Sequence, residues 1–249
     1  MIVSNTLQCI FVAVPKTATH AIRFALRQHM DEHQDWEQVG LFVHKKLPFA
    51  ELEQIDTGHI KAIEARPVLG EELWQRYFKF AVVRNPYDRF VSFCTFINRE
   101  DINFEQDALA RMKQIIADPA TQQRIHLRPQ HEFVCAANGD IMLDFIGRYE
   151  QLTNAYQHIC QRLGIRADRL PRVNRSVRRA FAEYYDEELR TAVHAFYHKD
   201  FELFGYPEKW EVGSSAWDAD LLSFYRFDPI GFRYTPIFGV DTPFHPLLE

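Results

Sequence analysis

The chain has 249 residues, of which 47% are hydrophobic and 25% are charged, a balance that suits one large folded domain. Its formal net charge of −5 argues against general nucleic-acid binding, which depends on dense positive charge. No apolar run reaches the roughly 18 residues that cross a bilayer, and the N-terminus lacks the basic start and cleavage site of a signal peptide, so we expect no membrane span.

The first part of the chain predicts a strand, a loop and a helix. Residues 9–14 (CIFVAV) form a near-continuous apolar run, which is typical of a central parallel strand buried on both faces. A short polar loop follows, and residues 21–30 then carry apolar side chains at helical spacing. Residues 48–55 predict a short helix that begins near a proline, and residues 59–65 (HIKAIEA) predict a second strand.

Strands and helices continue to alternate further along the chain. Residues 78–83 (FKFAVV) and 141–146 (IMLDFI) predict strands. Helices are expected at residues 104–117, ended by Asp118-Pro119, at 152–163, ended by Gly164, and at 183–204, ended by Gly205-Tyr206-Pro207. The alternation predicts an α/β fold, a three-layer sandwich with a central parallel sheet flanked by helices.

We assign residues 1–210 to one domain and residues 211–249 to a C-terminal extension. The extension interleaves prolines and glycines with aromatic residues, which makes it too aromatic for plain disorder. We expect it to pack on the domain without forming a second one. Two alternatives are contact with a partner subunit, which would give a homo-oligomer, and a lid over an acceptor site.

The four cysteines lie far apart, and no CxxC pair is present. We expect reduced, buried thiols rather than disulfides or metal ligands at Cys9, Cys94, Cys135 and Cys160. Together with the N-terminal sequence, this pattern favours a cytoplasmic location.

The loop at residues 15–20 (PKTATH) joins the first predicted strand to the first helix. The N–H groups that begin a helix have no helical partner, and the helix dipole favours an anion there. Lys16 adds a positive charge, and Thr17 and Thr19 add hydroxyl donors. The loop lacks the glycines of a kinase-type P-loop. By itself, the pattern also fits a lysine on an ordinary surface turn.

A second motif, RNPYDRFVS, follows the strand at residues 78–83. Arg84 lies at the strand end, Asn85-Pro86 begins a helix, and Ser92 lies further along that helix. An arginine and a nearby serine can bind one phosphate, because the guanidinium offers a fork of donors. The alternative for Arg84 is a salt bridge to Asp88, and for Arg89 we expect a structural role.

The ordered pair PKTATH and RNPYDRFVS resembles the 5'-phosphosulfate and 3'-phosphate motifs of sulfotransferases. The later stretches RPQHEFV, DFIGRYEQL, LPRVNRS, YYDEEL and YHKDFELFGY resemble the carbohydrate branch that includes the heparan sulfate and uronyl 2-O-sulfotransferases. The resemblance runs from Cys9 to Tyr206. It implies a P-loop-like fold and transfer of a sulfuryl group from 3'-phosphoadenosine 5'-phosphosulfate (PAPS) to a hydroxyl of a carbohydrate or other acceptor, leaving adenosine 3',5'-bisphosphate.

The resemblance also assigns the donor-binding residues. The residues that would hold the 5'-phosphosulfate are consecutive in the loop: Lys16, Thr17, Ala18, Thr19 and His20. His20 stands where the family usually has serine or threonine. Arg84 and Ser92 would hold the 3'-phosphate, while Asn174 and Ser176 lie in the segment that closes over the nucleotide in relatives. At His20 either the ring donates in place of a hydroxyl or the contact is lost.

Sulfuryl transfer to an alcohol needs a base for the proton, and histidine suits this role because its pKa lies near neutrality. His59 resembles the catalytic histidine of the 2-O-sulfotransferases, which lies in a His-Gly-His stretch. In this chain Thr57 stands in place of the first histidine of that stretch. The alternatives are a structural role for His59 and Glu64 as the base. Lys16 would stabilise charge on the leaving oxygen, and no metal is expected.

The acceptor side is less defined. His126, Arg128, Gln130 and His131 form a polar and basic group that suits a sugar hydroxyl or a uronate carboxylate, although a solvated loop would have the same composition. The acceptor classes left open are a nucleotide sugar, a glycolipid precursor, a secondary metabolite and an oligosaccharide.

Two other functions remain as alternatives. A P-loop kinase would need a Walker-type loop and a magnesium-binding acidic residue at a strand end, and neither is present in clear form. A non-catalytic binding protein that keeps the fold is the other, because His20 and Thr57 depart from the family pattern.

Overall fold

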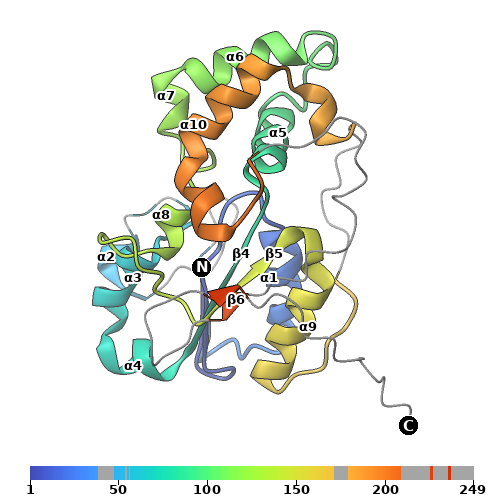
Figure 1. The fold of residues 1–249 in the computed structure, drawn as a ribbon. Helices are drawn as coiled ribbons and strands as arrows, with labels where there is room; N and C mark the ends of the chain where they lie inside the picture. The colour runs from blue at the N-terminus through green and yellow to red at the C-terminus, as the bar shows by residue number, and fades with distance from the viewer. Residues whose placement is uncertain are drawn as a thin grey trace.

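The computed structural model describes residues 1–38, 48–53, 55, 57–170, 179–208, 225–226 and 235–236 (Figure 1). Their strands form one mixed sheet with the order β3-β1-β2-β4-β5-β6-β7. The strands are β1 (Ile2–Ser4), β2 (Cys9–Phe11), β3 (Trp36–Glu37), β4 (Phe78–Val83), β5 (Phe145–Arg148), β6 (Tyr225–Arg226) and β7 (Thr235–Pro236).

The centre of the sheet is parallel, as predicted, and its edges are antiparallel. β2, β4 and β5 run in the same direction, with Phe11 opposite Phe80 and Phe80 opposite Phe145. β1 pairs antiparallel with both β2 and β3, and β6 pairs antiparallel with β5. The short connection between Ser4 and Cys9 accounts for the antiparallel pairing of β1 with β2, because a tight turn joins antiparallel neighbours.

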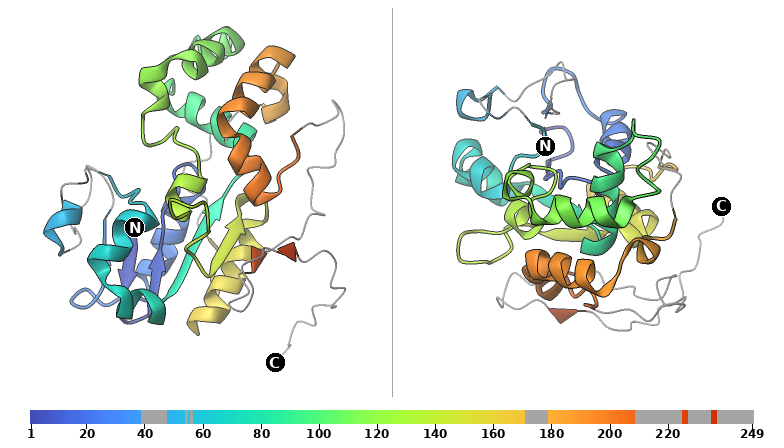
Figure 2. Two further views of the ribbon diagram at one scale, coloured as in Figure 1. Left: turned by 60° about the vertical axis from the view of Figure 1, so that its left-hand side comes forward. Right: turned by 90° about the horizontal axis from the view of Figure 1, so that it is seen from above.

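The helices surround this sheet in the described part of the chain. They are α1 (Thr19–Arg27), α2 (Ala50–Glu53), α3 (Ala62–Leu69), α4 (Glu71–Arg76), α5 (Pro86–Ile97), α6 (Ala108–Ala117), α7 (Pro119–Gln122), α8 (His131–Val134), α9 (Leu152–Leu163) and α10 (Glu187–Phe204). Short 3-10 helices occur at η1 (Tyr149–Gln151) and η2 (Phe181–Tyr184). Figure 2 shows α1 and α9 together on one side of the strands.

One face of the sheet packs against α1 and α9. Phe11, Phe80 and Phe145 contribute to this face, and they form a buried cluster with Ile22 of α1 and Ile159 of α9. The rings of Phe11 and Phe80 are stacked, with centroids 5.2 Å apart.

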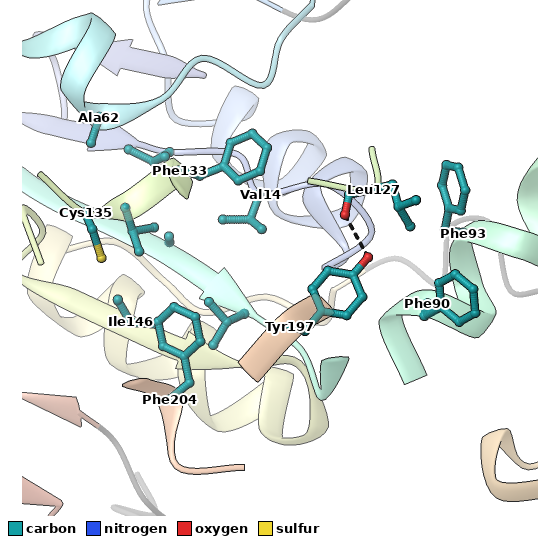
Figure 3. Packing of buried hydrophobic residues seen from close by; sticks show 14 of the residues in the cluster. Val14, Ala62, Phe90, Phe93, Leu127, Phe133, Cys135, Ile146, Tyr197 and Phe204 are labelled. Carbon is teal, nitrogen blue, oxygen red and sulfur yellow. Dashed lines mark hydrogen bonds between the residues drawn. The ribbon is translucent and has the colours of Figure 1, made fainter. Parts of the chain in front are cut away.

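The other face packs against a second group of helices that includes α8 and α10. Because strand side chains alternate between faces, Ile10, Ala81 and Ile146 belong to a second buried cluster, together with Phe133 of α8 and Phe204 of α10. Figure 3 shows part of this cluster, where the Tyr197 hydroxyl donates to the Leu127 carbonyl at 2.7 Å. The two clusters give the predicted three-layer α/β architecture.

Several predicted elements are confirmed. β4 covers residues 78–83 and α9 covers residues 152–163, as the apolar patterns indicated. Gly164 and Gly205 end α9 and α10 in the left-handed conformation, with φ of 67° and 61°. All four cysteines are buried thiols. No helix in the described ranges combines the length and apolar character needed to cross a membrane.

The strand predicted at residues 59–65 is wrong, since α3 begins at Ala62. The pattern HIKAIEA alternates over too few residues to separate a strand from a helix, and the local cap decides. The Glu64 carboxylate accepts the backbone N–H of Lys61 at 2.9 Å, which satisfies a donor at the helix start.

Other boundaries differ from the predictions as well: β2 ends at Phe11, and α10 begins at Glu187. The helix expected from residue 104 begins at Ala108, because turns occupy the preceding residues. The strand expected at residues 141–146 begins at Phe145, while Ile141 makes only an isolated bridge with Cys135. The apolar character of both segments comes from burial outside regular elements.

The extension at residues 211–249 is described only at β6 and β7. β6 adds to the edge of β5, with Phe145 opposite Arg226. The rest of this extension, and with it most of the expectation for the tail, lies outside the described residues.

Gly147 of β5 allows α9 to approach the sheet closely, because a Cβ at this position would lie 2.6 Å from the Cβ of Ala155. We predict that Gly147→Ala lowers the free energy of unfolding by about 1–3 kcal/mol through overpacking. Urea unfolding measures the change. Adding Ala155→Gly removes the clashing methyl group, so the double variant should lose less stability than the sum of the single variants; strict additivity would contradict the close approach.

Candidate active site

The loop from Pro15 to Ala18 connects the extended end of β2 to α1. Lys16 and Ala18 have φ of 67° and 63°, and non-glycine residues reach this left-handed region only at a cost of roughly 1–2 kcal/mol each. Left-handed residues in a turn direct successive backbone N–H groups into one concavity, an arrangement that binds anions. Ala18 is also the N-cap residue of α1 and has no side chain that could satisfy the first N–H groups of the helix.

Some side chains of the loop are buried and others are exposed to solvent. Thr17 is buried and its hydroxyl donates to the Val14 carbonyl at 2.9 Å, so this hydroxyl fixes the loop conformation. Thr19 is buried as well, while Lys16 is partly exposed and His20 is exposed. Lys16 and His20 are therefore the loop side chains that reach a ligand most readily.

The second motif lies directly against this loop. The Nη1 group of Arg84 donates to the Lys16 carbonyl at 3.1 Å, and the Nε group of Arg89 donates to the Pro15 carbonyl at 2.9 Å. Arg84 follows β4, and Arg89 and Ser92 belong to α5. The structure thus brings together the two motifs that the sequence suggested, and Arg89 has the structural role expected for it.

Arg84 also makes the salt bridge considered as its alternative role. Its guanidinium lies 2.7 Å from the Asp88 carboxylate and 4.0 Å from the ring centroid of Tyr149. Burial lowers the pKa of Arg84, but Asp88, Tyr149 and Glu150 outweigh burial and hold this pKa above its ordinary value. Because a guanidinium has five N–H donors, the contacts described leave donors for a phosphate.

The side chain of Gln130 forms hydrogen bonds with the backbone of Arg84. This side chain has no exposed surface, and its amide accepts the Arg84 N–H and donates to the Arg84 carbonyl, both at 2.8 Å. The backbone N–H of Gln130 donates to the buried carboxylate of Asp200 at 2.7 Å. The sequence-based role of Gln130 in acceptor binding does not match this buried position; the residue holds Arg84 in place.

His59 lies beside the start of the loop. Its Nδ1 is 2.6 Å from the Ala13 carbonyl, and since a carbonyl only accepts, Nδ1 carries the hydrogen and Nε2 keeps the lone pair. Burial lowers the pKa of His59 well below the ordinary histidine value, with Arg23 and His126 adding to the effect. The ring is therefore neutral near pH 7, with Nε2 as a free base.

Several hydrogen bonds fix the turn before His59. The Thr57 hydroxyl accepts the backbone N–H of His59 at 3.1 Å, so the residue that departs from the family pattern orients the histidine. Arg23 of α1 donates to the Gly58 carbonyl at 3.1 Å. Nothing in the sequence predicts this role for Arg23, because a lone arginine on a helix carries no signal for the contact.

His126 lies next to His59, with the two ring centroids 5.2 Å apart and edge to face. Burial, followed by the positive charges of Lys16 and Arg89, lowers the pKa of His126. The structure therefore places one of the predicted acceptor residues beside the predicted base.

Arg128 and His131 each contact a carboxylate. Arg128 pairs with Glu132 at 2.7 Å, and Lys61 pairs with the same carboxylate at 2.8 Å. The Nδ1 of His131 is 2.7 Å from buried Asp200, and His131 lines a hollow of about 690 Å³ together with Lys61. The mixture of donors and acceptors is suitable for hydroxyl groups.

The other sequence candidates have separate positions. Glu64 is exposed and caps α3, which accounts for it without a catalytic role. Asn174 and Ser176 lie outside the described residues. Within the described ranges, no three His, Cys, Asp or Glu side chains lie close enough together to hold a metal ion.

A model of the sulfotransferase family matches residues 1–207, so the chain belongs to this family. The match covers both motifs and every described residue of the site. Comparisons with curated proteins and with solved structures give no match. Membership assigns sulfuryl transfer as the class of activity.

The left-handed conformation of Ala18 makes a prediction about loop strain. Ala18→Gly should raise the free energy of unfolding by up to about 1 kcal/mol, because glycine adopts positive φ without a steric cost. Ala192→Gly on the exposed face of α10 is the matched control and should lower it by a similar amount. Urea unfolding of both variants measures the difference; destabilisation of equal size at both positions would mean that Ala18 is unstrained.

Proposed function

We propose that this sulfotransferase uses PAPS as donor and transfers its sulfuryl group to a hydroxyl group of an acceptor, with His59 as the base. The observation that carries the proposal is the contact between the two motifs, in which Arg84 donates to the carbonyl of Lys16 at 3.1 Å. This contact sets an anion-binding loop next to a second cationic group, which suits a nucleotide with phosphates at two positions.

Each of the two motifs would bind a different phosphate group of the donor. The backbone N–H groups of residues 16–19 and the Lys16 ammonium would hold the 5'-phosphosulfate. Arg84 and Ser92 would hold the 3'-phosphate, and the contacts of Arg84 with Asp88 and Gln130 keep its guanidinium in place. His20 is exposed beside the loop and would donate from its ring.

The chemistry requires one bond to form and one to break. The acceptor oxygen bonds to sulfur while the bond from sulfur to the 5'-phosphate oxygen breaks, which gives a sulfate ester and adenosine 3',5'-bisphosphate. His59 takes the hydroxyl proton on Nε2, since Nδ1–H is held by Ala13. Lys16 stabilises the negative charge that develops on the leaving oxygen.

We further propose that the acceptor is a carbohydrate or a similar hydroxylated molecule. The resemblance to the 2-O-sulfotransferase branch supports this class, as do the polar groups that continue from His126 through Arg128 and Glu132 to Lys61. The Glu132 carboxylate pairs with both Arg128 and Lys61, so the group offers donors and an acceptor to a hydroxyl. A cytoplasmic location remains a prediction.

The activity is tested by transfer of ³⁵S from labelled PAPS to a panel of acceptors that contains nucleotide sugars, glycolipid precursors and oligosaccharides. We predict that His59→Ala lowers kcat about 10²–10⁴-fold while the affinity for adenosine 3',5'-bisphosphate stays unchanged. Glu64→Gln is the control and should retain full turnover. Full turnover by His59→Ala would remove His59 from the mechanism.

The pKa of His59 predicts the pH dependence. The neutral ring is the active form, and burial lowers its pKa, so kcat/KM should be level near neutrality and fall only below about pH 6.5. The pH profile of His126→Gln should keep this fall at acid pH (the acid limb). The pH profile of the residual activity of His59→Ala should lack it. An acid limb at or above the ordinary histidine pKa would contradict the buried, neutral base.

Arg84 is predicted to supply much of the affinity for the 3'-phosphate. Arg84→Lys keeps a charge but loses the fork of donors, and it should weaken binding of adenosine 3',5'-bisphosphate by about 1.5–3 kcal/mol. Calorimetry with adenosine 5'-monophosphate is the control, because this ligand lacks the 3'-phosphate and should lose little. Equal losses for both nucleotides would place the 3'-phosphate elsewhere.

A further inference from the structure

Phe96 is an exposed aromatic ring at the edge of the candidate active site. It lies in the last turn of α5, four positions beyond Ser92, and 42% of its surface is exposed. A large apolar side chain gains nothing from this exposure, since its burial would be favourable. The surroundings of the ring therefore need an explanation other than core packing.

The ring of Phe96 holds the ammonium group of Lys16. The Nζ atom lies 3.9 Å from the ring centroid, well within the distance of a cation–π interaction, and the Arg99 guanidinium lies 4.8 Å from the same centroid. Lys16 is the residue that would face the phosphosulfate. An anion bound at the loop would therefore compete with the aromatic ring for this ammonium.

Phe96 also begins a row of rings that leads to the proposed base. Its centroid is 6.3 Å from that of His126, which is in turn 5.2 Å from that of His59. An acceptor that lies against Phe96 would thus be within the same short row as His59. Apolar faces of sugar rings pack well on aromatic rings, while their hydroxyl groups remain free at the edge.

We propose that Phe96 is a positioning and specificity residue that links the binding of donor and acceptor. Without donor, the ring holds the Lys16 ammonium. An anionic phosphosulfate attracts this ammonium more strongly than a ring quadrupole does, so donor binding draws Lys16 away. The freed ring surface then packs against the apolar face of the acceptor. This order of binding rests on the proposed function, because it requires an anionic donor at the loop.

The first test uses adenosine 3',5'-bisphosphate as probe. Phe96→Leu removes the competing cation–π contact, so the bisphosphate should bind about two- to fivefold more tightly than to the wild type. Phe96→Trp keeps the aromatic surface and should restore the wild-type affinity or weaken it slightly. Unchanged affinity in Phe96→Leu, or loss of binding in a variant whose thermal unfolding is normal, would overturn the role of Phe96 as a holder of Lys16.

The second test uses the acceptor that gains label in the panel. Phe96→Leu should raise its KM about tenfold with kcat nearly unchanged, and Phe96→Trp should restore KM. Ile102→Ala is the matched control, because Ile102 is apolar, follows closely in the chain and is 92% exposed. An unchanged KM in Phe96→Leu would overturn the acceptor role. Failure of the wild type to bind the bisphosphate would instead overturn the proposed function, so the two failures are distinct.

Discussion

The guanidinium of Arg89 is the connection on which the rest of the site depends. It is 1% exposed and donates to the carbonyls of Pro15 at 2.9 Å, His126 at 3.2 Å and Arg128 at 2.8 Å. One buried side chain on α5 thus joins the loop at residues 15–18 to the segment that carries His126 and Arg128. A hydrogen bond to a charged group commonly contributes about 1.5–3 kcal/mol, so these three bonds favour one arrangement of the segments relative to each other.

The topology explains why these segments meet at all. β2 and β4 are parallel neighbours, so their carboxyl ends lie at the same edge of the sheet, where α/β folds place ligands. The loop at Lys16 follows one strand and Arg84 follows the other. Arg23 of α1 then connects the loop's own helix to the turn at Gly58, which positions His59. The donor loop and the proposed base are therefore held by the same helix.

Much of the fold and the loop at residues 15–20 could be predicted from the sequence, because apolar runs and the paired motifs are local patterns. The contacts that orient the candidate site residues could not. The bond from His59 to Ala13 joins residues far apart in the chain, and the burial of Gln130 behind Arg84 depends on Asp200 in α10. Residues 59–65 have a strand-like pattern, but the cap at Lys61 and Glu64 begins helix α3 there. β1 contains only Ile2–Ser4, which is too short for a clear periodic signal.

The central claim is that the loop and Arg84 together bind a nucleotide with phosphates at its 5' and 3' positions. Calorimetric titration with adenosine 3',5'-bisphosphate in the presence of a chelator, compared with ATP–magnesium, tests it most directly. We predict binding of the bisphosphate without metal and weak or no binding of ATP–magnesium. Binding of ATP–magnesium with no binding of the bisphosphate would contradict it.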